Sequence, residues 1–319
     1  MHILITGAGG FIGQLIASAL LNDSQYTVTL AGIVQPKIPG NVKYPQNAKT
    51  VTADLSDATC LPSIVTKDLN AVYVLHGIMS SGSEADFELG MQGNVYATMN
   101  LLEALRKTCP GVRVIYTSSM AVYGRPIPDV VHNGVIPTPQ SSYGAEKIVC
   151  ETLINDYTRR KFIDGFILRL PSIVVRPGEP TAAASSFLSG MIREPFSGLA
   201  CIIPIVERSL VSWLCSPRTL VCNLLHTLTI PSDALPSHIR QINLPGIGVS
   251  IQEMMDALAS VGGDNLLKYL KEENDEKLIP ILKSWATAVD NGPALELGYK
   301  KDVCFEDIVR DYKNFLLQA

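Results

Sequence analysis

The sequence lacks any grouping of cysteines that would bind a metal or form a disulfide framework. Its seven cysteines are scattered along 319 residues, and none forms a Cys-x-x-Cys pair or stands near a histidine at the spacing of a zinc site. Separated cysteines in an odd number are typical of buried thiols in a reducing compartment. We therefore expect no metal ion, no disulfide and a cytoplasmic location.

Clusters of basic residues and long apolar runs are also absent. The formal net charge is -4, and no Lys/Arg cluster alternates with aromatic residues, so nothing favours nucleic acid as a partner. No apolar run approaches the length of a membrane-spanning helix. The first apolar run starts at His2, which leaves no room for the basic start of a signal peptide. We expect a soluble protein with neither a nucleic-acid nor a membrane partner.

What the first half does contain is an alternation of short apolar runs with longer helical patterns. Apolar runs separated by helices predict a parallel sheet covered on both faces, and thus a doubly wound α/β (Rossmann) fold. The expected helices span residues 11–21, 87–107 and 142–160. The expected strands are HILITG (2–7), YTVTLAGIV (26–34), KTVTADL (49–55), AVYVLHG (71–77), VRVIYTSS (112–119) and GFILRLP (165–171).

After residue 171 this regular alternation ends. Proline and small residues dominate RPGEPTAAASSF (176–187), and only isolated strand and helix patterns follow. We therefore predict a dinucleotide-binding domain over residues 1–171. Residues 172–319 are predicted to form a smaller, mainly substrate-binding region, with some segments returning to the Rossmann core.

Three glycines follow the first predicted strand. In ITGAGGFIGQ (5–14), Gly7, Gly10 and Gly13 lie between that strand and a helix. A tight turn, close backbone approach and a helix N-terminus together suit a pyrophosphate. Three glycines alone can also be a purely structural turn, and the strand–turn–helix context favours the dinucleotide.

The second predicted strand lacks the acidic residue that usually binds the adenosine ribose at its tip. In TVTLAGIVQP (27–36) this position is expected to be Gly32. The loss removes both a ribose contact and the charge that would repel a 2′-phosphate. The nearest downstream cation is Lys37, beyond the expected tip of the loop. NAD is therefore the first expectation for the cofactor, and NADP is not excluded.

Tyr143 and Lys147 are four residues apart in SSYGAEKIVCE (141–151), so a helix would place them on one face. A free tyrosine, with a pKa of about 10, is a poor base near neutrality, and an adjacent ammonium favours the phenolate. This pair can also belong to an ordinary amphipathic helix. Its significance grows because VIYTSSMAVYG (114–124) ends a predicted strand with hydroxyl groups, including Ser119, at the ligand-binding edge of the sheet.

The order and spacing of TGxxGxxG, SSxxxYG and YxxxK resemble the extended short-chain dehydrogenase/reductase family, in its epimerase/dehydratase-like branch. The resemblance implies that Ser119 orients the substrate hydroxyl, Tyr143 exchanges its proton, and Lys147 binds the nicotinamide ribose and tunes Tyr143. Met120 and Ala121 occupy the positions of the acid pair of dehydratases, which argues against dehydration. The cofactor-lining positions that it implies are Gly7, Gly10, Phe11, Ile12, Gly13, Gly32, Asp54, Leu55, Leu75, His76, Gly77, Asn94, Tyr143, Lys147 and Pro171.

Longer local segments resemble one subgroup, the D-erythronate dehydrogenase-like proteins, which oxidise the C2 hydroxyl of a four-carbon sugar acid with NAD. The segments are HGIMSSGSEADFELG (76–90), LRLPSIVVRPGEPTAAASSF (168–187), GMIREP (190–195) and LCSPR (214–218). A small polyol acid needs hydroxyl partners and a cation for its carboxylate. Besides Ser119 and Tyr143, the predicted substrate residues are Ser80, Ser81, Ser185, Arg176 and Arg193. The arginines can equally form salt bridges, and the serines can be ordinary loop residues.

The expected reaction is hydride transfer between nicotinamide and a secondary alcohol, with phenolate Tyr143 taking the hydroxyl proton. A divergent ketoreductase or sugar epimerase of the same family is the alternative. A non-catalytic dinucleotide-sensing protein is a more remote one, because it would not need Ser119, Tyr143 and Lys147 together. The family also implies a homodimer formed through the helices predicted at 87–107 and 142–160.

Overall fold

A computed structural model describes residues 1–180 and 183–318 and divides the chain into two compact units. The first unit comprises residues 1–122, 139–169 and 221–242. The second comprises residues 123–138, 170–220 and 243 onward. Each unit is therefore assembled from separated pieces of the chain.

A central seven-stranded sheet has the strand order β10-β6-β5-β4-β1-β2-β3. Its pairs β1–β2, β2–β3, β1–β4 and β4–β5 are parallel, as the sequence pattern predicted. Chain order reverses between β1 and β4, and in such sheets this switch point is where ligands bind. The strands are β1 (His2–Thr6), β2 (Thr27–Gly32), β3 (Ala48–Thr52), β4 (Leu69–Val74), β5 (Arg113–Ser119), β6 (Asp164–Leu170) and β10 (Gln241–Asn243).

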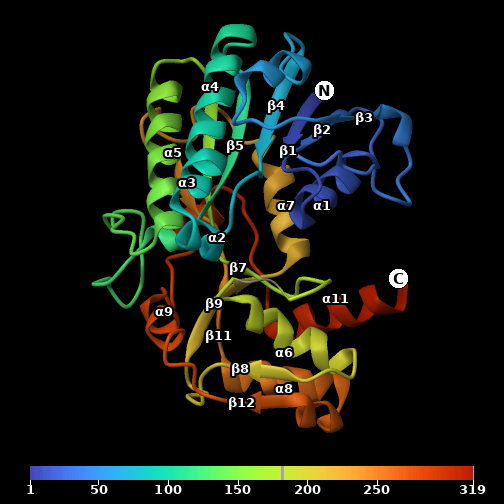
Figure 1. The fold of residues 1–319 in the computed structure, drawn as a ribbon, viewed down its shortest axis with the longest axis vertical. Helices are drawn as coiled ribbons and strands as arrows, with labels where there is room; N and C mark the ends of the chain where they lie inside the picture. Colours follow the sequence, from blue (N-terminus) through green and yellow to red (C-terminus); the bar gives the residue numbers. More distant parts are fainter. Residues whose placement is uncertain (181–182, 319) are drawn as a thin grey trace. The chain divides into compact units, whose positions relative to one another are not determined.

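The helices α4 and α5 lie side by side against this sheet (Figure 1). The single helix predicted over residues 87–107 is a run of three elements, because a π-helical segment separates α3 from α4. The helical elements of the first unit are α1 (Phe11–Leu20), η1 (Pro45–Asn47), η2 (Ala58–Ser63), α2 (Ser80–Ala85), α3 (Phe87–Gly90), η3 (Met91–Tyr96), α4 (Ala97–Thr108), η4 (Met120–Val122) and α5 (Ser142–Arg159).

Apolar residues on both faces of the strands explain the two-sided covering of the sheet. Leu4 of β1 belongs to a buried cluster with Leu101 of α4 and Ile154 of α5. Its neighbours Ile3 and Ile5 are also fully buried and point to the opposite face, because side chains alternate along a strand. Each such side chain stabilises the fold by about 1.5–3 kcal/mol relative to an exposed position.

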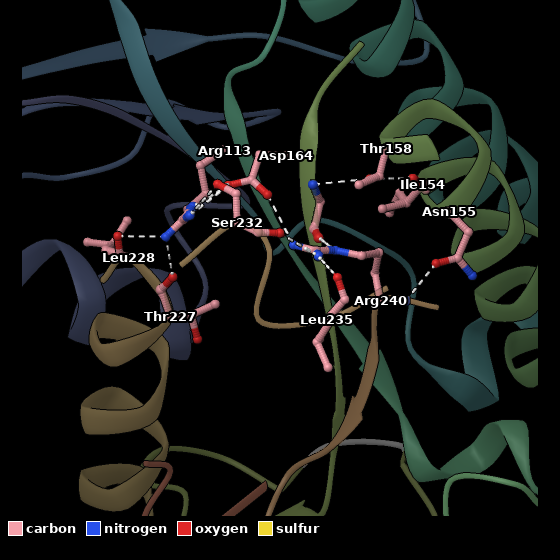
Figure 2. A network of polar contacts seen from close by, with 11 residues as sticks. Arg113, Ile154, Asn155, Thr158, Asp164, Thr227, Leu228, Ser232, Leu235 and Arg240 are labelled. Carbon is pink, nitrogen blue, oxygen red and sulfur yellow. Dashed lines mark hydrogen bonds and ion pairs between the residues drawn. The ribbon is translucent and has the colours of Figure 1, made fainter. Parts of the chain in front are cut away.

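A buried polar network joins the amino ends of β5 and β6 to the segment before β10 (Figure 2). Arg240 is fully buried, and its guanidinium donates to the Gly165 and Ser232 carbonyls and pairs with Asp164 at 3.0 Å. Arg113 pairs with the other Asp164 oxygen at 2.6 Å. Ligands of such folds bind at the carboxyl ends of the strands, so this network at the opposite edge stabilises the sheet rather than forming the site.

The second unit contains two small sheets and a separate core. A three-stranded sheet has the order β11-β9-β7, and β8 pairs with β12. The core includes side chains from α6, α8 and α11. Helix α7 (Pro217–Thr227) crosses the division between residues 220 and 221. The other elements are β7 (Ser172–Ile173), α6 (Ser186–Phe196), β8 (Cys201–Ile203), β9 (Val211–Cys215), β11 (Ile247–Ser250), α8 (Ile251–Gly262), η5 (Asp264–Tyr269), β12 (Leu270–Glu272), α9 (Ile279–Ser284), α10 (Gly292–Glu296) and α11 (Phe305–Gln318).

Candidate active site

The glycine turn after β1 packs directly on the loop after β4, at the switch point of the sheet. Gly7 has φ +65°, and a Cβ there would lie 2.7 Å from the His76 nitrogen and 2.8 Å from the Leu75 carbonyl carbon. A Cβ on Gly13 would lie 2.7 Å from Cα of Ala8. Both glycines are therefore required by close backbone contact and not only by chain flexibility.

Helix α1 begins immediately after this turn and offers free backbone donors. The N-cap residue Gly10 has no side chain to cap the helix, and its own N–H donates to the Gly7 carbonyl at 3.0 Å. The first-turn amides of Phe11 and Ile12 have no partner among the described residues. Such donors and the positive end of the helix dipole fit the pyrophosphate of a dinucleotide.

The predicted ribose-binding positions lie at the ends of β2 and β3. Gly32 is the last residue of β2, as expected. Asp54 is exposed and accepts hydrogen bonds from the backbone and side chain of Ser56. The Leu55 side chain is buried in the core, so only its backbone is available to a ligand.

His76 is a neutral histidine bridging two threonines. Its Nδ1 lies 2.8 Å from Thr6 Oγ1, and its Nε2 lies 3.4 Å from Thr98 Oγ1. Burial of the ring, together with the positive charge of Lys147, lowers the pKa of His76 to about 3. The imidazole therefore stays uncharged near neutrality. His76 lies beside the glycine turn, and its predicted contact with the cofactor stays a prediction.

Asn94 is buried, and its amide is fully engaged within the protein. Its Oδ1 accepts from the Ile78 N–H at 2.7 Å, and its Nδ2 donates to the Ile78 carbonyl at 3.0 Å. Gly77, at φ +147°, has no room for a Cβ because the Asn94 side chain occupies that space. The predicted cofactor residue Asn94 therefore fixes the backbone of the loop after β4.

Tyr143 and Lys147 come together on α5, as their spacing predicted. Lys147 Nζ lies 5.4 Å from the Tyr143 ring centroid and 4.7 Å from that of Tyr116. The same ammonium donates to the Thr117 carbonyl at 2.9 Å, and Lys147 is 4% exposed. The charge is thus held between the helix and the carboxyl end of β5, close to the tyrosine that it is expected to tune.

Ser119 is the last residue of β5 and follows by two residues Thr117, whose carbonyl accepts from Lys147. Its Oγ accepts from the Ala121 N–H at 3.1 Å. Gly144, next to Tyr143, packs on the Ala121 carbonyl so closely that a Cβ would collide with it. This contact joins the start of α5 to the turn after Ser119, so the three predicted catalytic residues converge at one edge of the first unit.

A buried ion pair that the sequence analysis missed supports this edge. Glu151 accepts from Arg169 Nε at 2.9 Å and Nη2 at 2.5 Å, and from Ser118 Oγ at 2.5 Å. The available signal was helical spacing, since Tyr143, Lys147 and Glu151 recur at four-residue intervals on one face. The pair ties α5 to β5 and β6 next to Ser119.

The predicted substrate residues fall in both units. Ser80 and Ser81 open α2 in the first unit, half-exposed, and their hydroxyls bond to no other described residue. Arg193 is buried, pairing with Glu194 at 2.6 Å and donating to the Arg176 carbonyl at 2.9 Å. The predicted substrate residue Ser185 and the predicted cofactor residue Pro171 lie in the second unit with both arginines, and Ser185 precedes α6.

Arg176 differs from its neighbour in having no acceptor for its side chain among the described residues. Burial and the charge of Arg193 both lower the pKa of its guanidinium. A guanidinium that is partly buried and has no acceptor attracts an anion. Between the two predicted carboxylate-binding cations, Arg176 is the one available to a ligand.

The described residues contain no group of His, Cys, Asp and Glu that would hold a metal ion. Among the described helices, none is both long and apolar enough to cross a membrane.

Residues 3–208 match the model of the NAD dependent epimerase/dehydratase family. The chain belongs to this family, whose fold and cofactor class agree with the glycine turn and with the Tyr143–Lys147 pair. The family resemblance inferred from the sequence is thereby confirmed.

Its relatives include two proteins that match along almost the whole chain. The D-erythronate dehydrogenases of Haemophilus influenzae and Cupriavidus necator are 40% and 39% identical, each over 98% of both chains. A nucleoside-diphosphate-sugar epimerase from Agrobacterium tumefaciens superimposes with a TM-score of 0.88 at 33% identity, over 97% of this chain and 92% of that one. An L-threonine dehydrogenase from C. necator shares the fold, with a TM-score of 0.85 at 20% identity, over 99% and 100%.

Proposed function

We propose that this chain is an NAD(P)-dependent oxidoreductase that oxidises the C2 hydroxyl of a small sugar acid, with D-erythronate as the first candidate. The observation that carries the proposal is the geometry around Lys147, which lies between Tyr143 and the end of β5. The names of the two full-length relatives support a sugar acid as the substrate.

In the proposed mechanism, Ser119 and Tyr143 hydrogen-bond the substrate hydroxyl. Lys147 stabilises the phenolate form of Tyr143, which accepts the hydroxyl proton. A nicotinamide dinucleotide held by the glycine turn and Lys147 would supply the hydride acceptor for C2. Neutral His76 adds no second positive charge beside Lys147. In the reverse direction Tyr143 donates the proton to a 2-keto acid.

The substrate carboxylate is assigned to Arg176, because Arg193 is already paired with Glu194. We expect Arg176→Met to raise KM for D-erythronate about 10- to 100-fold, since a hydrogen bond to a charged group contributes about 1.5–3 kcal/mol. Turnover of the neutral polyol erythritol should be unaffected. The measurement is nicotinamide absorbance with both substrates. Arg218→Met, which removes an exposed ion pair, is the control.

Equal activity of wild type on erythritol and erythronate would contradict recognition of a carboxylate. Turnover of a nucleoside-diphosphate sugar in preference to either would favour the epimerase alternative, which the A. tumefaciens structure keeps open. Tight dinucleotide binding without turnover of any of these substrates would favour the sensing protein.

Cofactor preference is assigned to Gly32 and Lys37. Gln14 of α1 donates to the carbonyls of Ala8 and Lys37, at 2.8 and 3.0 Å, so the Lys37 backbone lies against the glycine turn. The backbone that carries the Lys37 side chain is therefore closer to this turn than sequence distance suggested. We keep NAD as the first cofactor and propose that Lys37 permits some use of NADP.

We expect Gly32→Asp to bind NAD about tenfold more tightly and to lose its NADP activity, because the carboxylate can accept from the ribose and repels a 2′-phosphate. A Cβ at this position lies 3.1 Å from the Val34 carbonyl, so the loop has to move by a few tenths of an ångström. Calorimetric titration with each dinucleotide measures the change. Lys37→Met should weaken NADP alone, and an unchanged preference in both variants would place the ribose elsewhere.

The homodimer implied by the family stays a prediction. It fits a set of exposed apolar side chains on four helical elements of the first unit. These are Phe87 and Leu89 on α3, Tyr96 on η3, Met99 on α4 and Val149 on α5.

A further inference from the structure

A second buried glutamate on α5, Glu146, has no role in the proposed mechanism. Glu146 lies between Tyr143 and Lys147 in the sequence and is 2% exposed. One carboxyl oxygen, Oε2, accepts from Ser83 Oγ at 2.9 Å and from Asn94 Nδ2 at 2.5 Å. The other, Oε1, has no hydrogen-bond partner among the described residues. Burying a half-satisfied carboxyl group is costly, so its retention needs a reason.

The partners of Glu146 show what it holds. Ser83 is fully buried and belongs to α2, the short helix that opens with Ser80 and Ser81. Asn94 uses its remaining donor and acceptor on the backbone of Ile78, two residues before α2 begins. One carboxyl group therefore fastens both the helix α2 and the loop that leads into it to the catalytic helix.

Two neighbouring contacts strengthen this attachment. Glu84, the next residue of α2, accepts from the Ser142 N–H at 3.0 Å, so α2 is also tied to the first turn of α5. Gly90 packs on Glu146 so closely that a Cβ would collide with Oε1. The backbone around the carboxyl group is thus shaped to admit it.

We propose that Glu146 is a positioning residue, which sets the specificity of the site by holding α2 so that Ser80 and Ser81 present their hydroxyls to the sugar acid. This inference rests on the proposed function. Ser80 and Ser81 are half-exposed and bond to no other described residue, as substrate-binding hydroxyls should be. Ser83 and Glu146 are themselves buried and therefore inaccessible to a substrate.

The test compares Glu146→Ala with Glu146→Gln. The alanine variant frees Ser83 and Asn94, so we expect KM for D-erythronate to rise about tenfold with kcat and NAD affinity changed less than about threefold. Glutamine keeps the accepting oxygen and places a neutral group at the unpartnered position, so it should restore KM to within about twofold of wild type. Glu88→Ala, at an exposed position of α3, is the matched control.

Hydrogen exchange provides a readout that does not need turnover. Amides of residues 78–85 should exchange faster in Glu146→Ala, and those of β1 should not. Ser83→Ala, which removes a single donor, should move KM and exchange in the same direction by a smaller amount. Ser83→Ala also tests the inference if Glu146→Ala fails to fold.

Three results would overturn the inference. The first is an unchanged KM together with unchanged exchange in Glu146→Ala, and the second is a loss of NAD affinity in that variant as large as its rise in KM. The third is a Glu146→Gln variant that behaves like Glu146→Ala. If wild type does not turn over any sugar acid, the proposed function fails. Unchanged exchange in Glu146→Ala would then reject the positioning role separately.

Discussion

Replacing Tyr143 with phenylalanine is expected to reduce kcat by about a thousandfold, because the change removes the only group proposed to take the substrate proton. The ring remains, and with it the packing of the half-exposed side chain against the Lys147 ammonium 5.4 Å away. Folding and NAD affinity should therefore stay close to wild type. Steady-state turnover on D-erythronate, with calorimetric titration of NAD, measures both quantities.

The control for this variant is Tyr96→Phe, which removes the same hydroxyl from an exposed position on η3. It should retain full activity. A Tyr143→Phe enzyme within about tenfold of wild type would transfer the proton-accepting role to another group, since loss of a positioned acid or base costs at least about a hundredfold. An unfolded or NAD-deficient variant would instead assign Tyr143 to structure.

The pH dependence of kcat/KM should show no contribution from His76. The low pKa of His76, about 3, means that this ring does not change charge between pH 5 and 9. Any ionisation seen in kcat/KM in that range should therefore belong to a group other than His76.

The parallel sheet and the proximity of Tyr143 and Lys147 were predictable because their signals are local. Continuous apolar runs mark buried parallel strands, and a four-residue interval on a helix places Tyr143 and Lys147 on one face whatever the rest of the chain does. The glycine turn was readable for the same reason. The structure adds that Gly7 is fixed by the backbone at residues 75 and 76, which no local pattern reveals.

The supporting residues were not predictable because their partners are far away in sequence. Glu146 accepts hydrogen bonds from Ser83, which is 63 residues away in sequence, and from Asn94, which is 52 residues away. Helical periodicity predicts that such a residue faces inward, and it does not predict which side chains the residue contacts. The same holds for the cation predicted to bind a carboxylate. Arg176 and Arg193 were equivalent in sequence, and only the ion pair of Arg193 with Glu194 separates them.

The second large effect is expected from Gly7→Ala, which should weaken NAD binding about 100-fold or more. An L-residue in the left-handed region costs about 1–2 kcal/mol, and here φ is +65°. The new Cβ would also lie 2.7 Å from the His76 nitrogen and 2.8 Å from its Cα. Since the backbone on both sides directly follows the sheet strands β1 and β4, the turn has to open, and the first-turn amides of α1 move away from the pyrophosphate position. Fluorescence titration with NADH measures the affinity, and a thermal melt confirms that the variant is folded at the titration temperature.

Gly9→Ala provides the matched comparison, since a Cβ at this neighbouring position meets no atom within 4 Å and its φ is not in the left-handed region. It adds the same methyl group to the same turn without strain, and we expect NAD affinity within about threefold of wild type, because an unstrained Gly→Ala change alters stability by only about 0.4–1 kcal/mol. Equal affinity in both variants would mean that the dinucleotide does not depend on the shape of this turn. Equal loss in both would mean that the cofactor itself, and not the loop after β4, excludes a side chain there. Only loss confined to Gly7→Ala supports a turn whose shape is set by the contact between the carboxyl ends of β1 and β4.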